Sequence, residues 1–239
     1  MSKVIDAFGQ VYLAYLNGEP SNHFTERDDG NIRESKSAHY YFRTFDEWEP
    51  YEQKAIQEAK GRVLDVGLGA GRHVLYLQEK GFEVVGIDTS PLAIEVSQRR
   101  GVKDARFMSL FDLDFPDNSF DTVLMLGQNL ALGGVEEIRS YLSRLYEITK
   151  HDGIIIGEAR DPSNTDNPEH IAYQKRNWKT PLKAGLVRIR IGFRDGVGEW
   201  FNLFLLDQET LEEVIKPTGW QLGKMYNSTT GMYIAILTK

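Results

Sequence analysis

From residue 62 onward, short apolar stretches alternate with segments whose apolar side chains recur at helical spacing. The apolar stretches are residues 62–67, 83–88, 105–108, 120–126 and 153–158. The helical segments between them are residues 71–80, 91–100 and 135–149. Strands rich in apolar residues and separated by helices predict an α/β fold, with a doubly wound parallel sheet covered on both faces.

This alternation stops after residue 160. Turn-forming residues fill 161–168, a helix is expected at about 169–178, and apolar and basic positions alternate over 186–193. A hairpin turn and another apolar strand follow, which together predict a small β-rich insertion after the fifth strand, at about residues 161–206. The basic members of the alternation are Arg188, Arg190 and Arg194. They either attract an anionic substrate or form a solvated face, and we expect the solvated face.

The last part of the chain predicts a helix capped by Asp207 and then two strands, at about 221–226 and 232–237. Such a closing hairpin would add an antiparallel edge strand to the sheet. At the other end, the first sixty residues are rich in aromatic side chains and predict helices at about 4–16 and 45–59 with a loop between them. We therefore divide the chain into an N-terminal helical segment, 1–60, and a main domain, 61–239.

Composition narrows the class of protein. The 239 residues carry a net charge of −7, so a broad basic surface for nucleic acid is not expected. No apolar stretch is long enough to cross a bilayer, and the first residues lack the pattern of a secretory signal. The chain has no cysteine and no pair of histidines at ligand spacing, so no metal site is expected. A cytoplasmic protein is the expectation, and the oligomeric state stays open.

The most informative segment is a strand that runs into a glycine-rich turn at Gly67, Gly69 and Gly71. Glycine there allows a sharp turn and the close approach of a ligand. The third glycine comes one position earlier than a dinucleotide fingerprint requires, and Asp65 stands two residues before the first. A carboxylate at this place would oppose a pyrophosphate, so it indicates a ligand that carries a positive charge.

Asp88 ends the next strand, which lies beside the first in a doubly wound sheet. A carboxylate at that position can accept hydrogen bonds from the two hydroxyls of a ribose. The alternative is that Asp88 only caps the helix that follows it or is a simple acidic residue of the loop.

Three segments together resemble the class I S-adenosylmethionine-dependent methyltransferases. Residues 63–71 are similar to the first motif of that family, 86–91 to its second strand with the ribose-binding acid, and 115–123 to the segment leading into its fourth strand. The resemblance covers roughly residues 61–158. It implies a seven-stranded, mostly parallel sheet with an antiparallel edge strand, and S-adenosylmethionine as cofactor with S-adenosylhomocysteine as product.

The resemblance also implies roles for individual residues. Asp65 would support the ammonium group and Asp88 the ribose hydroxyls. The acid that the family usually offers to adenine is replaced by Ser109, with Asp112 as an alternative. The other implied cofactor contacts are Gly67, Leu68, Gly69, Thr89, Leu110, Phe111, Gly127 and Gln128.

The acceptor site is harder to locate, because methyl transfer depends largely on alignment and exclusion of water. The resemblance suggests that the N-terminal helices form a lid with a tyrosine near the reacting methyl group. Our candidates for the catalytic residues are therefore Tyr41 and then Tyr40, followed by Glu158, which ends a buried strand. The alternative role of Glu158 is a salt bridge with Arg160 or another lid residue. His73 is expected to be a helix-surface or packing residue rather than a base.

The expected function is transfer of a methyl group to a small-molecule acceptor. The alternatives are methylation of a tRNA or of a protein side chain, and a cofactor-binding protein of the same fold without catalysis. An NAD-dependent oxidoreductase is disfavoured by Asp65 and by the glycine spacing.

Overall fold

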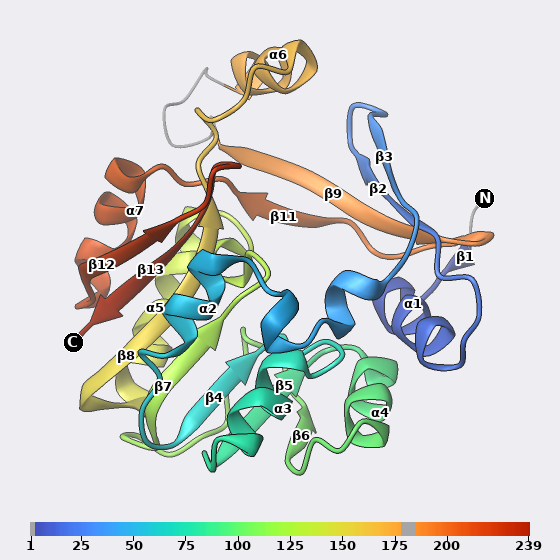
Figure 1. Ribbon diagram of the computed structural model, residues 1–239. Helices are drawn as coiled ribbons and strands as arrows, with labels where there is room; N and C mark the ends of the chain where they lie inside the picture. Colours follow the sequence, from blue (N-terminus) through green and yellow to red (C-terminus); the bar gives the residue numbers. More distant parts are fainter. Residues whose placement is uncertain (1–2, 178–184) are drawn as a thin grey trace. The chain divides into compact units, whose positions relative to one another are not determined.

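The computed structural model describes residues 3–177 and 185–239, and Figure 1 shows their helices and strands. The strands are β1 (Lys3–Val4), β2 (His23–Arg27), β3 (Ile32–Ser35), β4 (Val63–Val66), β5 (Val84–Asp88), β6 (Ala105–Phe107), β7 (Phe120–Met125), β8 (Thr149–Arg160), β9 (Leu186–Phe193), β10 (Gly196–Val197), β11 (Phe201–Phe204), β12 (Gln221–Asn227) and β13 (Met232–Thr238). The α-helices are α1 (Ala7–Leu16), α2 (Pro50–Ile56), α3 (Arg72–Glu79), α4 (Pro91–Arg99), α5 (Val135–Ile148), α6 (Pro168–Asn177) and α7 (Gln208–Ile215). Short 3-10 helices include η1 (His39–Phe42), η2 (Phe45–Glu47) and η3 (Asn129–Ala131).

The larger sheet has seven strands in the order β12-β13-β8-β7-β4-β5-β6. Neighbours β5 and β6 are parallel, as are β7 and β8, whereas β13 runs antiparallel to β8 and pairs with β12 in a hairpin. The predicted α/β fold, with a mostly parallel sheet and an antiparallel edge, is confirmed.

A second sheet joins the insertion to the N-terminal residues. Its order is β1-β10-β9-β2-β3, with β11 also paired to β9. The loop expected between the two N-terminal helices is therefore wrong, because this stretch contains the hairpin β2–β3 and the short helix η1. The expected helix over 45–59 is also shorter, since η2 and α2 are separated by extended residues at Trp48 and Glu49. The last residue of the helix expected at 169–178 lies outside the described residues.

Arg188 and Arg194 are exposed and Arg190 is half-buried, in keeping with the expected solvated face, and two of the three form ion pairs. Arg190 forms an ion pair with Glu26 at 2.7 Å, and its guanidinium group lies 4.5 Å from the centre of the Trp200 ring. Arg194 pairs with Glu19 at 2.6 Å. The charges of this strand are thus partly neutralised by acids from the N-terminal residues.

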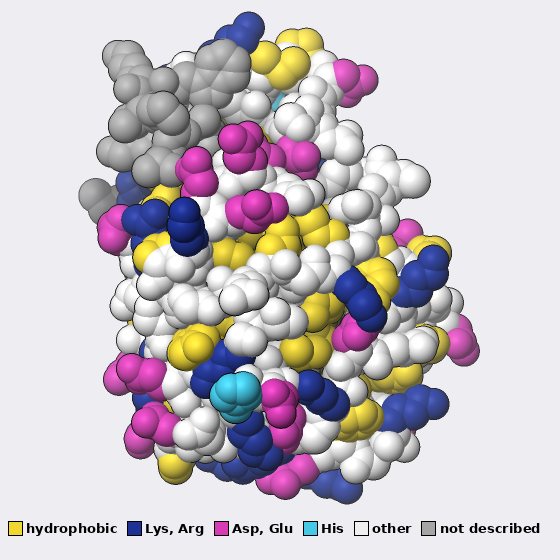
Figure 2. Space-filling model, turned by 90° about the vertical axis from the view of Figure 1, so that its left-hand side faces the viewer, with side chains coloured by type: hydrophobic (Ala, Val, Ile, Leu, Met, Phe, Trp, Pro, Cys, Tyr) yellow, Lys and Arg dark blue, Asp and Glu magenta, His cyan; other side chains and the backbone are white. Residues whose placement is uncertain are grey.

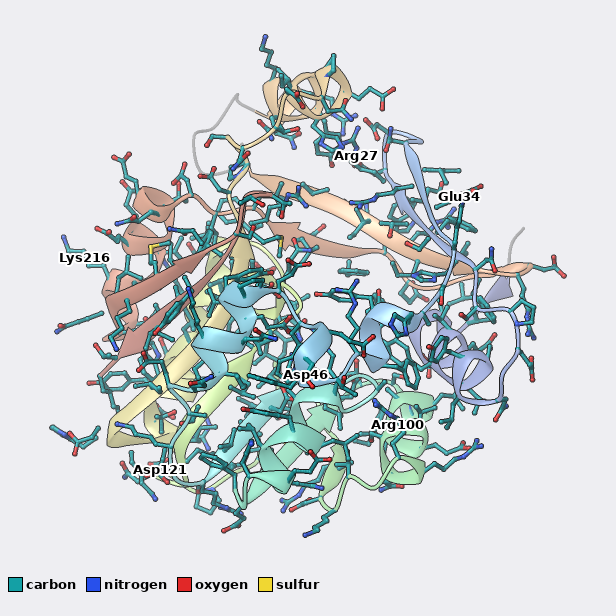
Figure 3. The ribbon with its side chains drawn as sticks, viewed as in Figure 1. Arg27, Glu34, Asp46, Arg100, Asp121 and Lys216 are labelled. Atoms are coloured by element: carbon teal, nitrogen blue, oxygen red, sulfur yellow. The ribbon has the colours of Figure 1, made fainter. Side chains whose placement is uncertain are left out.

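The chain divides into two compact units. Unit 1 comprises residues 1–48, 64–112 and 188–201, and unit 2 comprises residues 49–63, 113–187 and 202–239. In unit 1, α1 packs against α4 around a buried cluster that includes Val11, Tyr12 and Val96. Arg100, labelled in Figure 3, fastens this core to the glycine turn: its guanidinium group donates a hydrogen bond to the Ala70 carbonyl and lies 4.6 Å from the centre of the Phe42 ring.

Unit 2 is built on β8, whose middle residues are buried between β7 and β13. Helix α5 contributes Ile138, Leu142 and Leu145, all with no exposed surface, to its core. Trp220 is 2% exposed and donates its ring N–H to the Leu142 carbonyl at 2.9 Å, which satisfies its one polar atom.

The face of the molecule in Figure 2 shows acidic and basic side chains interspersed with hydrophobic ones. Over the described ranges, no helix combines the length and the apolar character that a bilayer span requires. Within the same ranges, no group of three or more histidine or acidic side chains is arranged to hold a metal ion.

Candidate functional site

The glycine turn after β4 adopts the backbone conformation that its composition predicts. Gly67, Gly69 and Gly71 have φ angles of 72°, 54° and 81°, which other residues adopt only with strain. The amides of Gly67 and Leu68 both donate to the Ile87 carbonyl, at 2.8 and 3.0 Å. These two hydrogen bonds hold the turn after β4 against the carboxyl end of β5.

Asp65 is buried directly before this turn, with only 1% of its surface exposed. Its Oδ2 atom has no hydrogen-bond partner among the described residues. Burial raises the pKa of Asp65 to about 7; the Arg72 guanidinium lowers it and the Asp88 carboxylate raises it. An unpaired buried carboxylate is costly, so this atom is suited to receive a cationic ligand group.

Asp88 holds the same turn from the end of β5. Its Oδ2 accepts the Gly69 amide at 3.0 Å, and its Oδ1 accepts the Ser90 amide at 2.9 Å. Burial raises the pKa of Asp88, while hydrogen bonds from the amides of Ser90, Gly69 and Thr89 lower it. The cap of α4 is Ser90, whose hydroxyl accepts the Ala93 amide at 2.9 Å, so Asp88 is not the capping residue.

Aromatic residues from the N-terminal part of unit 1 surround this turn. A Cβ placed on Gly69 would lie 3.4 Å from Tyr12 Oη, so the Tyr12 hydroxyl borders the surface of the turn. The rings of Tyr12 and Tyr41 are 4.9 Å apart between centroids, and those of Tyr41 and Tyr40 are 5.4 Å apart. The predicted residues Tyr40 and Tyr41 are thus joined to the glycine turn through Tyr12.

Arg72, the first residue of α3, is 7% exposed and lies against two of these rings. Its guanidinium group is 4.7 Å from the centre of the Tyr40 ring and 5.4 Å from that of Trp48. Burial raises the pKa of Tyr41 to about 12, and the charge of Arg72 lowers it. Tyr41 is therefore neutral at physiological pH, so its hydroxyl can donate a hydrogen bond but does not act as a ready-made base.

The segment after β6 contains the residues predicted to hold a nucleobase. Ser109 Oγ accepts the Phe111 amide at 3.1 Å, which folds the segment into a tight turn. Leu110 is 6% exposed, whereas Phe111 is 61% exposed. An aromatic ring this exposed beside a fixed turn offers a flat apolar face to a planar ligand.

Glu158 occupies a different environment, in unit 2. Its carboxylate is 1% exposed and accepts the Tyr51 hydroxyl at 2.6 Å and the amides of Gly127 and Gln128 at 2.6 and 3.3 Å. Both Gly127 and Gln128 have φ angles of 69°, so this turn carries a strained non-glycine residue. Glu158 thus holds this turn and fastens it to Tyr51.

The structure thus brings Asp65, Gly67, Leu68, Gly69 and Asp88 together, and it gathers Thr89 with them through the Asp88 carboxylate. His73 is 7% exposed and its ring lies 4.9 Å from that of Trp48, which confirms the predicted packing role. Sequence reasoning did not single out Arg72, Tyr51 or the position of Tyr12. Only Arg72 had a usable signal, since it directly follows the last glycine of the turn.

Several known proteins with a similar sequence or fold are methyltransferases. Residues 64–157 match the family model described as a methyltransferase domain. A solved S-adenosylmethionine-dependent methyltransferase from Bacteroides fragilis, in complex with S-adenosylhomocysteine, is 27% identical and superimposes with a TM-score of 0.82, covering 99% of this chain and 98% of that one. This chain has the class I S-adenosylmethionine-dependent methyltransferase fold.

Two curated relatives agree with this class. One relative, from Geobacillus sp. (strain WCH70), is named as a methyltransferase. It is 28% identical over 148 residues, which are 54% of this chain and 60% of the relative. A glycine/sarcosine N-methyltransferase from Aphanothece halophytica is 25% identical, over 76% of this chain and 74% of the relative. The match therefore spans less than two thirds of the first relative and about three quarters of the second.

Proposed function

We propose that this protein transfers a methyl group from S-adenosylmethionine to a small-molecule acceptor. The observation that carries the proposal is the buried, unpartnered Oδ2 atom of Asp65 at the base of the glycine turn. The cofactor brings a cationic amino-acid group, a ribose and an adenine, and unit 1 has a residue suited to each of them. When bound, it supplies an electrophilic methyl group on a positively charged sulfur.

The residues present fit this ligand. Asp65 would accept the ammonium group, which would give its buried oxygen the partner that the described residues lack. Asp88 already accepts the amides of Gly69, Ser90 and Thr89, and a carboxylate has about four acceptor sites, so it keeps capacity for a ribose hydroxyl. The exposed ring of Phe111 would cover adenine, with the Leu110 amide and Ser109 at its edge.

The glycine turn supports the same assignment. Gly69 leaves space that a Cβ would fill, beneath the Tyr12 hydroxyl. The close approach of a ligand to the backbone at this point requires glycine. The aromatic rings that pack around Tyr41 would exclude water from the reacting centre. Exclusion of water strengthens the electrostatic interactions inside the site.

We propose Tyr41 and Tyr40 as residues of the acceptor site and keep residues 1–60 as the proposed lid. Glu158 is better suited to a positioning role, because its carboxylate accepts the Tyr51 hydroxyl and the amides of Gly127 and Gln128 and so holds the turn. Gly127 and Gln128 form the turn that Glu158 positions, and their contact with the cofactor stays a prediction.

A small acceptor suits the acidic balance of the chain, whose net charge of −7 disfavours a polynucleotide. The relative from Aphanothece halophytica is named for glycine and sarcosine, which makes these two amines reasonable first probes.

The test is transfer of a labelled methyl group from S-adenosylmethionine to a panel of acceptors. The panel contains glycine, sarcosine, small phenols and bulk tRNA. We expect label in one of the small molecules and none in tRNA. Label in tRNA alone would overturn the small-molecule proposal, and binding of S-adenosylhomocysteine without any transfer would favour a cofactor-binding protein.

A further inference from the structure

His23 is a buried histidine that the proposed cofactor site does not use. It begins strand β2 in unit 1, and only 6% of its surface is exposed. Its Nδ1 atom lies 3.0 Å from the carbonyl oxygen of Ser21. A carbonyl oxygen can only accept, so Nδ1 carries the hydrogen in the neutral ring. The lone pair is then on Nε2. Within residues 3–177 and 185–239, no side chain or amide donates a hydrogen bond to this atom.

Ser21 positions both His23 and the tyrosine beside it. Its carbonyl orients the imidazole, while its hydroxyl accepts the Ala38 amide at 3.0 Å, directly before η1. Helix η1 carries Tyr41, and the ring centroids of His23 and Tyr41 are 6.0 Å apart. Ser21 is itself only 4% exposed, so this arrangement is held within the protein rather than at its surface.

The backbone of His23 is fixed from both sides as well. It pairs with Phe193 of β9 on one side and with Ser35 of β3 on the other. A residue in the middle of three strands does not move freely, and this is the rigid support that a catalytic side chain needs.

The aromatic contacts connect His23 to the glycine turn. Tyr41 contacts His23 on one side and Tyr12 on the other, at 6.0 and 4.9 Å between ring centroids. The Tyr12 hydroxyl borders Gly69 in turn. The Tyr41 ring, around which the acceptor site is proposed, therefore contacts both the imidazole of His23 and the Tyr12 ring beside the glycine turn.

We propose that His23 is the general base of the transfer and that the acceptor is a group with a proton to lose, namely a hydroxyl or a protonated amine. This inference rests on the proposed function. The acceptor atom uses its lone pair to form the bond to the methyl carbon, and the carbon–sulfur bond breaks with its electron pair remaining on sulfur. A protonated amine first passes a proton to Nε2 of His23, which frees the lone pair that attacks, whereas a hydroxyl passes its proton to Nε2 as the new bond forms. The proton leaves to water after product release. The charge thus moves from sulfur to the imidazole, and no other reactant is needed.

This assignment separates two classes of acceptor. A hydroxyl or an ammonium group must lose a proton before or during transfer, and a base in reach contributes typically 10²- to 10⁴-fold to such a step. A thioether or a tertiary amine has no such proton to lose and would gain nothing from His23. Tyr41, with its pKa raised to about 12 by burial, is the donor beside this base rather than a competitor for the proton.

The first experiment needs no acceptor. Diethyl pyrocarbonate modifies an unprotonated imidazole nitrogen that it can reach, and peptide mass spectrometry identifies the modified histidine. In the folded wild-type protein we expect modification of His23, more slowly than that of His151, because 6% of the surface of His23 is exposed and 98% of the side chain of His151. Absence of modification at His23, with His151 modified, would show that the nitrogen is not available and would overturn the proposal.

The second experiment uses His23→Asn with S-adenosylmethionine and the acceptor that the panel identifies. The amide nitrogen of asparagine can still donate to the Ser21 carbonyl, but the variant has no basic nitrogen at the place of Nε2. We expect kcat to fall about 100-fold or more, with Kd for S-adenosylhomocysteine within a factor of about two of the wild-type value. The matched control is His151→Asn, which should keep the parental rate.

Three outcomes decide the matter. An unchanged kcat in folded His23→Asn would overturn the assignment of the base. If that variant does not fold, His23→Gln provides the same comparison, and the modification of the wild-type protein stands independently. A failure of the wild-type protein to bind S-adenosylhomocysteine would instead count against the proposed function, so the two failures are distinguishable.

Discussion

Asp65 and Glu158 are both carboxylates with only 1% of their surface exposed, but their surroundings differ. Glu158, in unit 2, accepts a tyrosine hydroxyl and two backbone amides. Asp65, in unit 1, has an oxygen with no partner among the described residues. The first carboxylate has its bonding capacity used by the protein, whereas the second keeps capacity for a ligand.

This difference separates a structural group from a binding group more clearly than burial or residue type does. A buried carboxylate with several donors stabilises the segment that supplies them. A buried carboxylate without donors lowers the stability of the free protein and regains that energy when a cation binds. We therefore expect substitutions of the two residues to affect different measurements.

The largest expected effect is the pH dependence of stability that Asp65 causes. Its pKa is raised from 3.8 to about 7, so between these values the folded protein retains a proton that the unfolded chain loses. The contribution of Asp65 to the free energy of unfolding is therefore full below about pH 4, declines as the pH rises to about 7 and is constant above that. The total loss is up to about 4 kcal/mol.

The matched variant is Asp65→Asn, which cannot titrate. The free energy of unfolding, measured by urea titration without ligand from about pH 4 to pH 8, should decline more steeply for the wild type than for the variant. Parallel curves would mean that Asp65 is ionised normally in the folded protein, and the contrast with Glu158 would then be lost.

The second effect concerns the stability that Glu158 provides. Glu158→Ala leaves the Tyr51 hydroxyl and the amides of Gly127 and Gln128 without their acceptor, and it frees a strained turn. We expect the free energy of unfolding to fall by about 3 kcal/mol, measured by urea denaturation.

The control for this prediction is Tyr51→Phe, which removes a single donor and leaves the turn bonded. It should cost about 1 kcal/mol. Equal losses in the two variants would show that Glu158 serves Tyr51 alone and does not hold the turn.

The third effect is on cofactor affinity. Asp88→Ala removes the proposed acceptor for the ribose hydroxyls and also releases the Gly69 amide, so Kd for S-adenosylhomocysteine should rise at least about tenfold. Calorimetry gives this value directly. An unchanged Kd would leave Asp88 with only the role of holding the turn.

How much of this could be read from the sequence depends on how local each feature is. The glycine turn, Asp65 and Asp88 lie within a short stretch and were predictable, because backbone conformation there follows from residue type. The bond between Tyr51 and Glu158 joins residues 107 positions apart, and the pair of Glu26 with Arg190 spans 164 positions. No local pattern encodes such partners.

The same reason explains what was missed in the N-terminal segment. Strands β2 and β3 are short, and β2 finds a partner in β9 far along the chain. The residues of β2 lack clear alternation, so His23 gave no signal of its position beside Tyr41.

The smallest expected effect concerns the tyrosines. Tyr41→Phe keeps the ring contacts with Tyr12 and removes only the hydroxyl. If that hydroxyl contacts the acceptor, turnover should fall by about tenfold while cofactor affinity changes much less. Tyr40→Phe is the matched comparison, and parental turnover in both variants would remove these hydroxyls from the proposed site.

The central claim, that unit 1 contains a site for S-adenosylmethionine, is tested most directly by calorimetric titration of the wild-type protein. S-adenosylhomocysteine and NAD are titrated in parallel at neutral pH, with Asp65→Asn as the comparison protein. The account predicts binding of one S-adenosylhomocysteine per chain, weakened in Asp65→Asn, and no heat from NAD. Binding of NAD with no response to S-adenosylhomocysteine would contradict it.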